Sequence, residues 1–343
     1  MTTPTETKWA AEDAQKRQQG EAEAYLDGFG GTVGYPFAGW AELAQRIQPG
    51  EVDFLAAASG QGKTTIVRSI IERLVVEENV GIVWGAFETP PKVARIGMAA
   101  MLAGVDPGYV ISREWETWEP HLYDDAKKRV RASWSNLNSS PWHCLHITEH
   151  PHVSVRAVQE MGDMALAIQK DFPAGVLNIV DHVDHMGAAG ASSYKASVEA
   201  VAAIHDHAKQ YGTRWLVTTQ VHNRTAGAGG DRFWRHRPIP IAAIKNGQHK
   251  EEIATRIFCA YRPLKIGVTP DELKAVIEGK AEIGTCLANG VTAVDCLKHR
   301  HFGSRVGERV LLGWENGRIT DLPMSDRLAQ EGAKHGIKSN RNY

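Results

Sequence analysis

Nearly continuous runs of hydrophobic residues alternate with amphipathic stretches along most of the chain. The runs at 52–58, 80–87, 176–181 and 215–219 are typical of strands that are buried on both faces of a parallel sheet. Between these runs, hydrophobic residues recur every three or four positions, which predicts helices that pack on the sheet. The pattern therefore predicts an α/β fold with a twisted, mostly parallel central sheet flanked by helices.

The remaining elements follow from the same periodicity and from turn residues. Amphipathic patterns predict one or two surface helices between 106 and 141, and helices that include residues 66–74, 91–102, 153–170, 198–211 and 270–279. Further strands are expected at 253–261 and 291–298. Asn316-Gly317 separates the strand-like runs 309–314 and 318–322, and this dipeptide predicts a C-terminal β-hairpin.

Three parts of the chain differ in character. Residues 1–30 are polar with a thin apolar stripe, which predicts an N-terminal arm or linker helix. Residues 31–322 are expected to form one domain, and residues 323–343 a flexible tail. No apolar run approaches the roughly 20 residues of a membrane helix, and the N-terminus lacks the pattern of a secretory signal. No membrane association is therefore expected.

Charge and cysteine content narrow the possible partners and the compartment. The 343 residues carry a formal net charge of −1, with an isoelectric point of about 7.0. Binding to nucleic acid would therefore need a local basic surface rather than global charge. The four cysteines show no CxxC spacing, so they are expected to be reduced thiols in a cytoplasmic protein.

The stretch after the first apolar run has the features of a phosphate-binding loop. A buried strand, a glycine-bearing loop and a helix follow one another, so loop amides and the helix N-terminus can surround phosphates. The residues expected to contact the nucleotide are Ser59, Gly60, Gln61, Gly62, Lys63, Thr64 and Thr65. Lys63 would reach the β- and γ-phosphates and Thr64 would ligate Mg²⁺. Ala57 stands where the GxxxxGK[ST] pattern has its first glycine. The alternative is a glycine-rich turn with a solvated lysine.

Polar side chains stand at the ends of three other predicted core strands. Glu88 could hold a water for attack on the γ-phosphate, or it could be an ordinary acid at a helix N-terminus. Asp181 could be the second Mg²⁺-coordinating element, although Asp184 and nearby histidines also leave a metallohydrolase open. Gln220 could hydrogen-bond the γ-phosphate or the attacking water, or it could cap a loop.

A basic, glycine-rich segment at 223–248 suggests a further ligand. Its cations are interleaved with Phe233 and Trp234, and they are Arg224, Arg232, Arg235, Arg237 and Lys245. Phosphate contacts combined with base stacking suit single-stranded nucleic acid, whereas a charged surface loop is the alternative. A second loop is expected at 187–195 and ends in the cation Lys195.

These elements, in this order, resemble the C-terminal ATPase domain of DnaB-type replicative DNA helicases of bacteria and phages, within the RecA-like P-loop NTPase group. The stretches that carry the resemblance are GWAELAQRIQPGEVDFLAAASGQGKTT, VWGAFETPPKVARIGMAAMLAGV, VLNIVDHVDHM, WLVTTQVHNR and a KHR followed by a hairpin. In that family the first position of the phosphate loop is often Ala, as it is here.

The resemblance implies roles for residues at matching positions. Glu88 matches the catalytic base, and Gln220 matches the sensor that couples the γ-phosphate to the DNA-binding loops. Lys298 and Arg300 match a pair that reaches the nucleotide of the neighbouring subunit. Lys245 and Asn246 fall near the DNA-binding loop, as does the segment that ends at Lys195.

The resemblance also implies a function and its partners. It points to an ATP- and Mg²⁺-dependent, ring-forming helicase that moves on single-stranded DNA, with a hexamer suggested by analogy and other replication proteins as further partners. The alternative is a RecA-like ATPase that binds DNA without unwinding it, such as a recombinase, a loader or a mobile-element ATPase.

Four features depart from the family pattern. The stretch Lys250-Glu251-Glu252-Ile253-Ala254 stands where the family has an acidic Asp-Ala-Asp stretch before the last core strands. His182 replaces the usual aromatic residue after the metal-anchoring aspartate, and residues 301–304 replace an Asn-Gly-Pro turn after Arg300. The family's N-terminal helical domain has no counterpart in the roughly 30 residues before the core, which could correspond instead to the linker helix. Recruitment of a primase through that domain is accordingly not expected.

Overall fold

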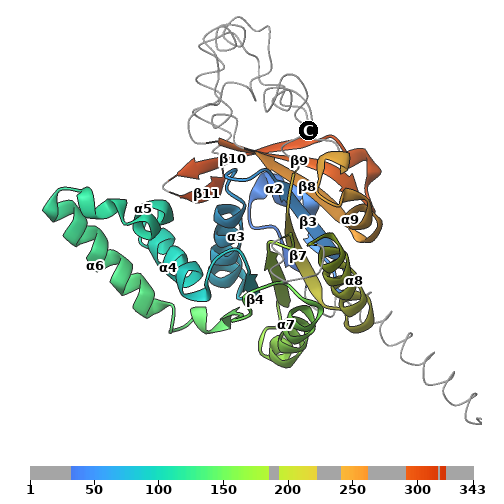
Figure 1. Ribbon diagram of the computed structural model, residues 1–343, viewed down its shortest axis with the longest axis horizontal. Coiled ribbons are helices and arrows are strands. Elements are labelled where there is room, and N and C mark those ends of the chain that lie inside the picture. The colour runs from blue at the N-terminus through green and yellow to red at the C-terminus, as the bar shows by residue number, and fades with distance from the viewer. Residues whose placement is uncertain (1–31, 185–192, 222–240, 262–290, 316, 322–343) are drawn as a thin grey trace, which may run out of the picture.

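The central sheet organises every other element of the molecule. The computed structural model describes residues 32–184, 193–221, 241–261, 291–315 and 317–321. Within these ranges, nine strands form one sheet in the order β11-β10-β9-β8-β3-β7-β6-β4-β5 (Figure 1). A separate two-stranded ribbon joins β1 (Val33–Gly34) to β2 (Arg46–Ile47).

Six adjacent strands of the sheet are parallel. They are β5 (Leu145–Ile147), β4 (Gly81–Ala86), β6 (Val176–Asp181), β7 (Arg214–Gln220), β3 (Val52–Ala57) and β8 (Arg256–Tyr261). Every residue of β3, β4 and β6 is buried, which agrees with their unbroken hydrophobic runs. Because the strands are parallel, their carboxyl ends lie at one edge, where ligands bind in open α/β sheets.

The last three strands reverse direction. They are β9 (Val291–His299), β10 (Arg309–Glu315) and β11 (Arg318–Asp321). β10 and β11 form the predicted hairpin, with Gly317 at a left-handed φ of 72° in its turn. Because β9 is antiparallel to β8, His299 lies opposite Arg256, at the amino edge of the parallel strands.

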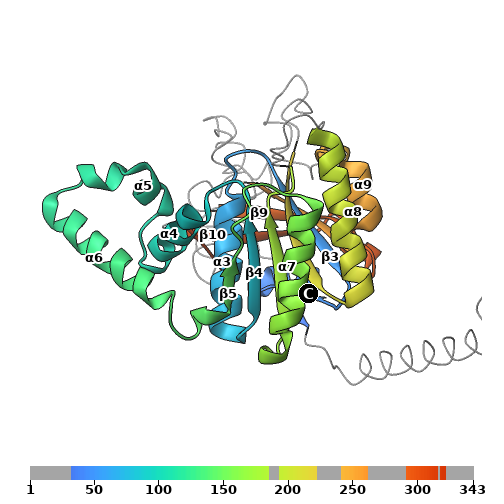
Figure 2. The same ribbon diagram turned by 60° about the horizontal axis from the view of Figure 1, so that its bottom comes forward.

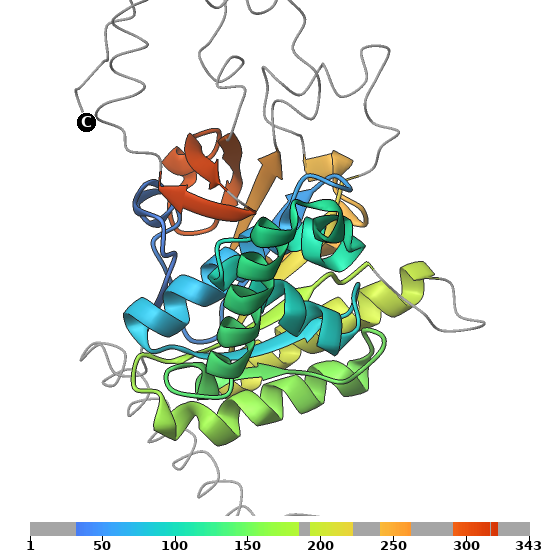
Figure 3. The ribbon, with the colours of Figure 1, turned by 90° about the vertical axis from the view of Figure 1, so that its left-hand side faces the viewer.

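Helices cover both faces of the sheet, so the predicted α/β architecture with a mostly parallel central sheet is confirmed. One face carries α7 (Val155–Ile168) and α8 (Ser193–Tyr211), which pack side by side (Figure 2). The other face carries α3 (Lys63–Glu78) and α4 (Pro91–Leu102). Outside α4 lie α5 (Pro107–Ser112) and α6 (Pro120–Asn136), which stand in front of the sheet in Figure 3.

Shorter elements complete the described part. α2 (Ala38–Ala44) packs beside β9 and β10, and α9 (Gly247–Ile253) packs beside α8. Single 3₁₀ turns are η1 (Glu114–Thr117), η2 (Trp142–Cys144), η3 (Gln169–Asp171), η6 (Ile241–Ala243) and η9 (Gly303–Arg305). Among the described helices, none has the length and apolar character that a bilayer span requires.

Two predicted boundaries are wrong. α8 begins at Ser193 rather than at 198, so Lys195 lies in the first helical turn and not in a loop. Residues 247–253 form α9, where the sequence predicted the end of a loop and the first residue of a strand. Both stretches are rich in polar residues and show little apolar periodicity, so contacts elsewhere in the fold hold them as helices.

Several expectations lie outside the described residues. These are the arm at 1–30, the helix at 270–279, the tail at 323–343 and most of the basic segment at 223–248.

Candidate functional site

The phosphate loop connects β3 to α3 at the carboxyl edge of the sheet. Gly60 and Gly62 both adopt left-handed φ values, 73° and 92°, and Gly62 is the N-cap of α3. A non-glycine residue at either position would be strained, which explains why small residues occupy this turn. The first-turn amides of α3 have no partner within the helix, so Lys63, Thr64 and Thr65 present N–H groups at its positive end.

Lys63 lies across this loop. Its ammonium group donates to the carbonyl oxygens of Ala57 at 3.1 Å and Ala58 at 3.3 Å. Burial lowers the pKa of Lys63, and the carboxylates of Asp181 and Glu88 oppose that shift. The lysine is thus a buried cation close to the acids that the sequence placed at neighbouring strand ends.

Asp181 is the last residue of β6, and it forms hydrogen bonds with the residues that follow the neighbouring strand β4. Its carbonyl oxygen accepts the amide of Phe87 at 2.8 Å and that of Glu88 at 3.3 Å. Its buried carboxylate accepts a hydrogen bond from the Thr218 hydroxyl at 2.8 Å. These bonds fix Glu88 beside Asp181, with the Glu88 side chain 45% exposed.

Gln220 ends β7 next to the phosphate loop. It pairs in register with Ala57, the last residue of β3, and its amide N–H donates to Asp184 at 2.7 Å. Its side-chain amide nitrogen lies 3.1 Å from Nε2 of His182. The same ring nitrogen is 3.6 Å from Glu88 Oε2. The side chains of Gln220 and Glu88 therefore both lie close to the ring of His182.

A buried ion pair between Lys250 and Asp184 holds the end of β7 that carries Gln220. Lys250 of α9 lies 2.8 Å from Asp184, and both side chains are essentially inaccessible to solvent. Lys250 also donates to the carbonyl oxygen of Lys245 at 2.6 Å, and the Thr219 hydroxyl donates to Asp184 at 2.6 Å. In the sequence Lys250 is only the first residue of a stretch that departs from the family pattern. Its burial was not predicted, because a lysine in the polar run GQHKEEI is ordinarily expected in solvent.

Trp314 of β10 is a second residue that sequence reasoning did not single out. A β-carbon built on Gly62 would lie 2.5 Å from the Trp314 ring, so the indole packs directly against the phosphate loop. Trp314 is separated from the loop by some 250 residues of sequence, and only the fold of the hairpin over α3 reveals the contact.

Lys298 and Arg300 lie away from these residues. The Arg300 amide donates to Thr255 O at 2.9 Å, and the Thr255 amide donates to Val52 O at 2.8 Å, at the start of β3. The phosphate loop follows the other end of β3, and six residues of strand extend about 20 Å. The side chains of Lys298 and Arg300 donate to the carbonyl oxygens of Glu251 and Glu252 in α9.

The expected DNA-binding residues are only partly described. Lys195 is exposed on α8 near Glu199, whereas Lys245 and Asn246 stand at the start of α9. Asn246 has a left-handed φ of 56°, and the Lys245 amide donates to Gln220 O at 2.8 Å. The backbone carbonyl of Gln220, the predicted sensor residue, thus accepts a hydrogen bond from Lys245, near the end of the predicted DNA-binding segment. Arg224, Arg232 and Arg235 lie outside the described residues.

Oxygen ligands suited to Mg²⁺ are present on the phosphate loop and on β6. Thr64 offers a hydroxyl beside Lys63, and Asp181 has one carboxylate oxygen bonded to Thr218. Hard oxygen donors with few protein ligands are what Mg²⁺ prefers when it also binds phosphates. In the described ranges no group of three or more His, Cys, Asp or Glu side chains could hold a metal, so no histidine-rich metallohydrolase centre forms there.

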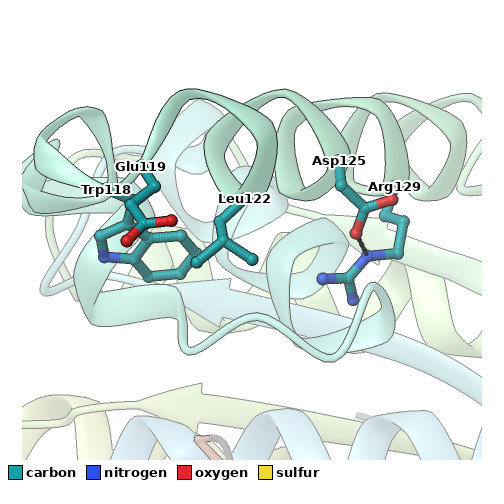
Figure 4. Close-up of a pocket in the computed structure, with 5 residues that line it drawn as sticks. All are labelled: Trp118, Glu119, Leu122, Asp125 and Arg129. Atoms are coloured by element: carbon teal, nitrogen blue, oxygen red, sulfur yellow. Dashed lines mark hydrogen bonds and ion pairs between the residues drawn. The ribbon is translucent and has the colours of Figure 1, made fainter.

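A small cavity of about 350 Å³ lies elsewhere, on α6. Figure 4 shows its lining residues Trp118, Glu119, Leu122, Asp125 and Arg129, with Arg129 paired to Asp125. It contains none of the predicted site residues.

The fold of this chain is similar to that of solved structures. A DnaB-like replicative helicase, solved with attention to its interactions with primase, superposes with a TM-score of 0.62 at 12% sequence identity, over 88% of this chain and 67% of that one. A separately solved ATPase domain gives the same score and identity over 90% of this chain and 98% of its own. The fold is that of a DnaB-type helicase ATPase domain. No protein-family model and no curated protein sequence matches the chain. At 12% identity, the likeness concerns the fold, and function must be argued from the site.

Proposed function

We propose that the protein is a Mg²⁺-dependent ATPase that translocates on single-stranded DNA and unwinds duplex DNA as a ring. The observation that carries the proposal is the gathering of a phosphate loop, Glu88, Asp181 and Gln220 at the carboxyl ends of the adjacent strands β3, β7, β6 and β4. Phosphoryl transfer needs this combination of cation, metal-anchoring oxygens and a base.

Each side chain has a task in hydrolysis. The amides of residues 59–65 and the Lys63 ammonium would bind the β- and γ-phosphates, and Thr64 and Asp181 would hold the metal. Mg²⁺ would neutralise charge that develops on the phosphate oxygens. Glu88, fixed beside Asp181, accepts a proton from the attacking water. Gln220 hydrogen-bonds the γ-phosphate and passes its presence to Lys245 through the backbone bond between them.

We further propose that Arg300 and Lys298 act on the nucleotide of an adjacent subunit. Both start from the amino edge of the sheet, about the length of β3 away from their own phosphate loop. An arginine at that edge would complete a site on another copy of the chain, which requires a head-to-tail contact, as in a ring. Hydrolysis would then depend on assembly.

A DNA-binding ATPase that does not unwind is the second candidate. The same catalytic residues would serve it, and the two functions differ only in what turnover does to DNA. The extensive likeness to a replicative helicase favours the first.

Unwinding of a labelled DNA fork tests the proposal. The full chain with ATP and Mg²⁺ should separate the strands, and Lys63→Ala should abolish both unwinding and DNA-stimulated hydrolysis. Hydrolysis without strand separation would favour the second candidate. No Lys63-dependent hydrolysis under any DNA condition would refute both.

A further inference from the structure

The ring of His182 has a fixed hydrogen-bonding pattern. Its Nδ1 accepts the amide hydrogen of Asp184 at 3.2 Å, and its side chain is 3% exposed. A ring nitrogen that accepts a hydrogen bond carries no proton, so the neutral ring has its hydrogen on Nε2.

This tautomer determines which way Gln220 turns. The amide nitrogen of Gln220 is placed 3.1 Å from Nε2 of His182, and with the ring hydrogen on Nε2 two donors would face each other. The oxygen and nitrogen of a glutamine amide are assigned from such partners. Turning the amide about its last bond, with the carbonyl oxygen toward His182 and the NH₂ group away from the ring, gives the Nε2–H group its acceptor.

Both backbone hydrogen-bonding groups of Gln220 have partners within the protein. Its N–H donates to Asp184 and its carbonyl accepts from Lys245, so the side-chain NH₂ is the donor left for a ligand. Because Gln220 pairs with Ala57 at the start of the phosphate loop, this donor stands at the phosphate side of the sheet edge.

The ring and the amide share one rigid support. Asp184 holds the ring through its own N–H and holds Gln220 through its carboxylate. Lys250 and the Thr219 hydroxyl fix that carboxylate in turn. The relative position of His182 and Gln220 is thus set by a buried network rather than by the two side chains alone.

We propose that His182 is a positioning residue that orients Gln220, with its NH₂ group toward the γ-phosphate. The catalytic consequence rests on the proposed ATP hydrolysis, whereas the tautomer and its contact with Gln220 do not.

NMR of the full chain with ¹⁵N-labelled histidine rings tests the geometry without ATP. The His182 signals, identified by their loss in His182→Gln, should show the Nε2–H tautomer, and Gln220→Ala should shift the Nε2 resonance. An Nδ1–H tautomer, an imidazolium ring at neutral pH or an unmoved Nε2 resonance would overturn the proposal.

Kinetics of a double-mutant cycle test the role. His182→Phe should lower kcat about 10- to 100-fold and leave the dissociation constant of a fluorescent ATP analogue within about twofold of wild type. His182→Gln, which can place an N–H near the Nε2 position, should recover most of kcat. Because His182 acts through Gln220, the variant His182→Phe/Gln220→Ala should be no slower than Gln220→Ala alone.

His207 provides a matched control, since it is a buried histidine on α8 that bonds to Thr213. His207→Phe should leave kcat unchanged. If His182→Phe does not fold, His182→Asn replaces it, because Asn is polar but too short to place a donor at Nε2. Additive losses in the cycle, or no rescue by Gln, would reduce His182 to a packing residue. Failure of the wild-type protein to bind the analogue would instead refute the proposed function and leave the NMR result standing.

Discussion

Replacing Lys250 by Met removes the cation from a buried ion pair. The side chains of Lys250 and Asp184 are 1% and 0% exposed, and their charged atoms are 2.8 Å apart. Met has nearly the same length and volume as the lysine stem, so the change leaves little cavity. The Asp184 carboxylate would keep two donors, the Thr219 hydroxyl and the Gln220 amide, but would lose its counter-charge.

The expected loss of stability follows from that geometry. Removing one partner of a fully buried pair costs about 3–5 kcal/mol, because the remaining charge cannot be solvated. The variant Asp184→Asn/Lys250→Met removes both charges, and Asn can still accept from Thr219 and Gln220. Its unfolding free energy should therefore lie closer to wild type than that of Lys250→Met, with a coupling energy of about 2 kcal/mol or more.

Urea unfolding at neutral pH measures all four corners of this cycle, and the ten tryptophans provide a fluorescence signal. The exposed pair Asp125–Arg129, 2.9 Å apart with side chains 63% and 48% exposed, is the control. Asp125→Asn should cost no more than about 0.5 kcal/mol. If Lys250→Met is no more costly than Asp125→Asn, or if the two buried changes are additive, the reasoning about this pair is refuted.

The same pair predicts how stability depends on pH. Burial alone would raise the pKa of Asp184, but Lys250, Thr219 and the Gln220 amide outweigh burial and hold that pKa below its ordinary value. A carboxyl group with a depressed folded-state pKa stabilises the protein above its unfolded pKa, and that contribution is lost as the pH falls through the folded value. Below about pH 4, wild type should therefore lose stability more steeply than Asp184→Asn/Lys250→Met. Parallel acid unfolding curves would contradict this.

Three further changes probe the site directly. Gly62→Ala should abolish binding of a fluorescent ATP analogue, because φ is 92° and the new methyl would meet Trp314; normal binding would contradict that contact. Glu88→Gln should lower kcat about 10²- to 10⁴-fold in a phosphate-release assay and spare analogue binding, and normal turnover would exclude Glu88 as the base. Lys245→Ala should weaken binding to labelled single-stranded DNA and reduce the slope of log affinity against log salt by about 0.7. An unchanged slope would remove Lys245 from the DNA path.

The residues at the nucleotide-binding edge could be predicted because each depends only on its own strand and the turn after it. A parallel strand buried on both faces is written as an unbroken apolar run, as in β3 and β6. The residue that follows such a run stands at the ligand-binding edge whatever the rest of the chain does. Glu88, Asp181 and Gln220 could therefore be proposed as neighbours before the strand order was known.

The support behind those residues could not be predicted in the same way. Lys250 is buried only because Asp184, Thr219 and Lys245 supply its bonds, and nothing in a polar seven-residue helix indicates that partnership. In the sequence His182 is only a departure from a family pattern, since its meaning depends on the orientation of one ring. The contact of Trp314 with Gly62 depends on how the hairpin folds over α3.

α9 links two of the proposed functions through seven residues. Its first residues follow Lys245 and Asn246, and its buried Lys250 supports the predicted sensor strand β7. Its last turn presents the carbonyl oxygens that receive Lys298 and Arg300, at the negative end of a helix. A change in β7 can therefore reach the residues that are proposed to act on a neighbouring subunit.

If Arg300 acts only on a neighbour, two inactive variants should restore activity to each other. Arg300→Ala keeps an intact phosphate loop, and Lys63→Ala keeps an intact Arg300. When equal amounts are mixed and reassembled, about one interface in four combines a working loop with a working arginine in a head-to-tail ring. DNA-stimulated hydrolysis should then rise to about a quarter of wild type, above either variant alone. The matched control mixes Lys63→Ala with Lys63→Ala/Arg300→Ala, in which no interface has a working loop. A mixture as inactive as its parents, from proteins shown by light scattering to co-assemble, would mean that Arg300 does not act across the interface.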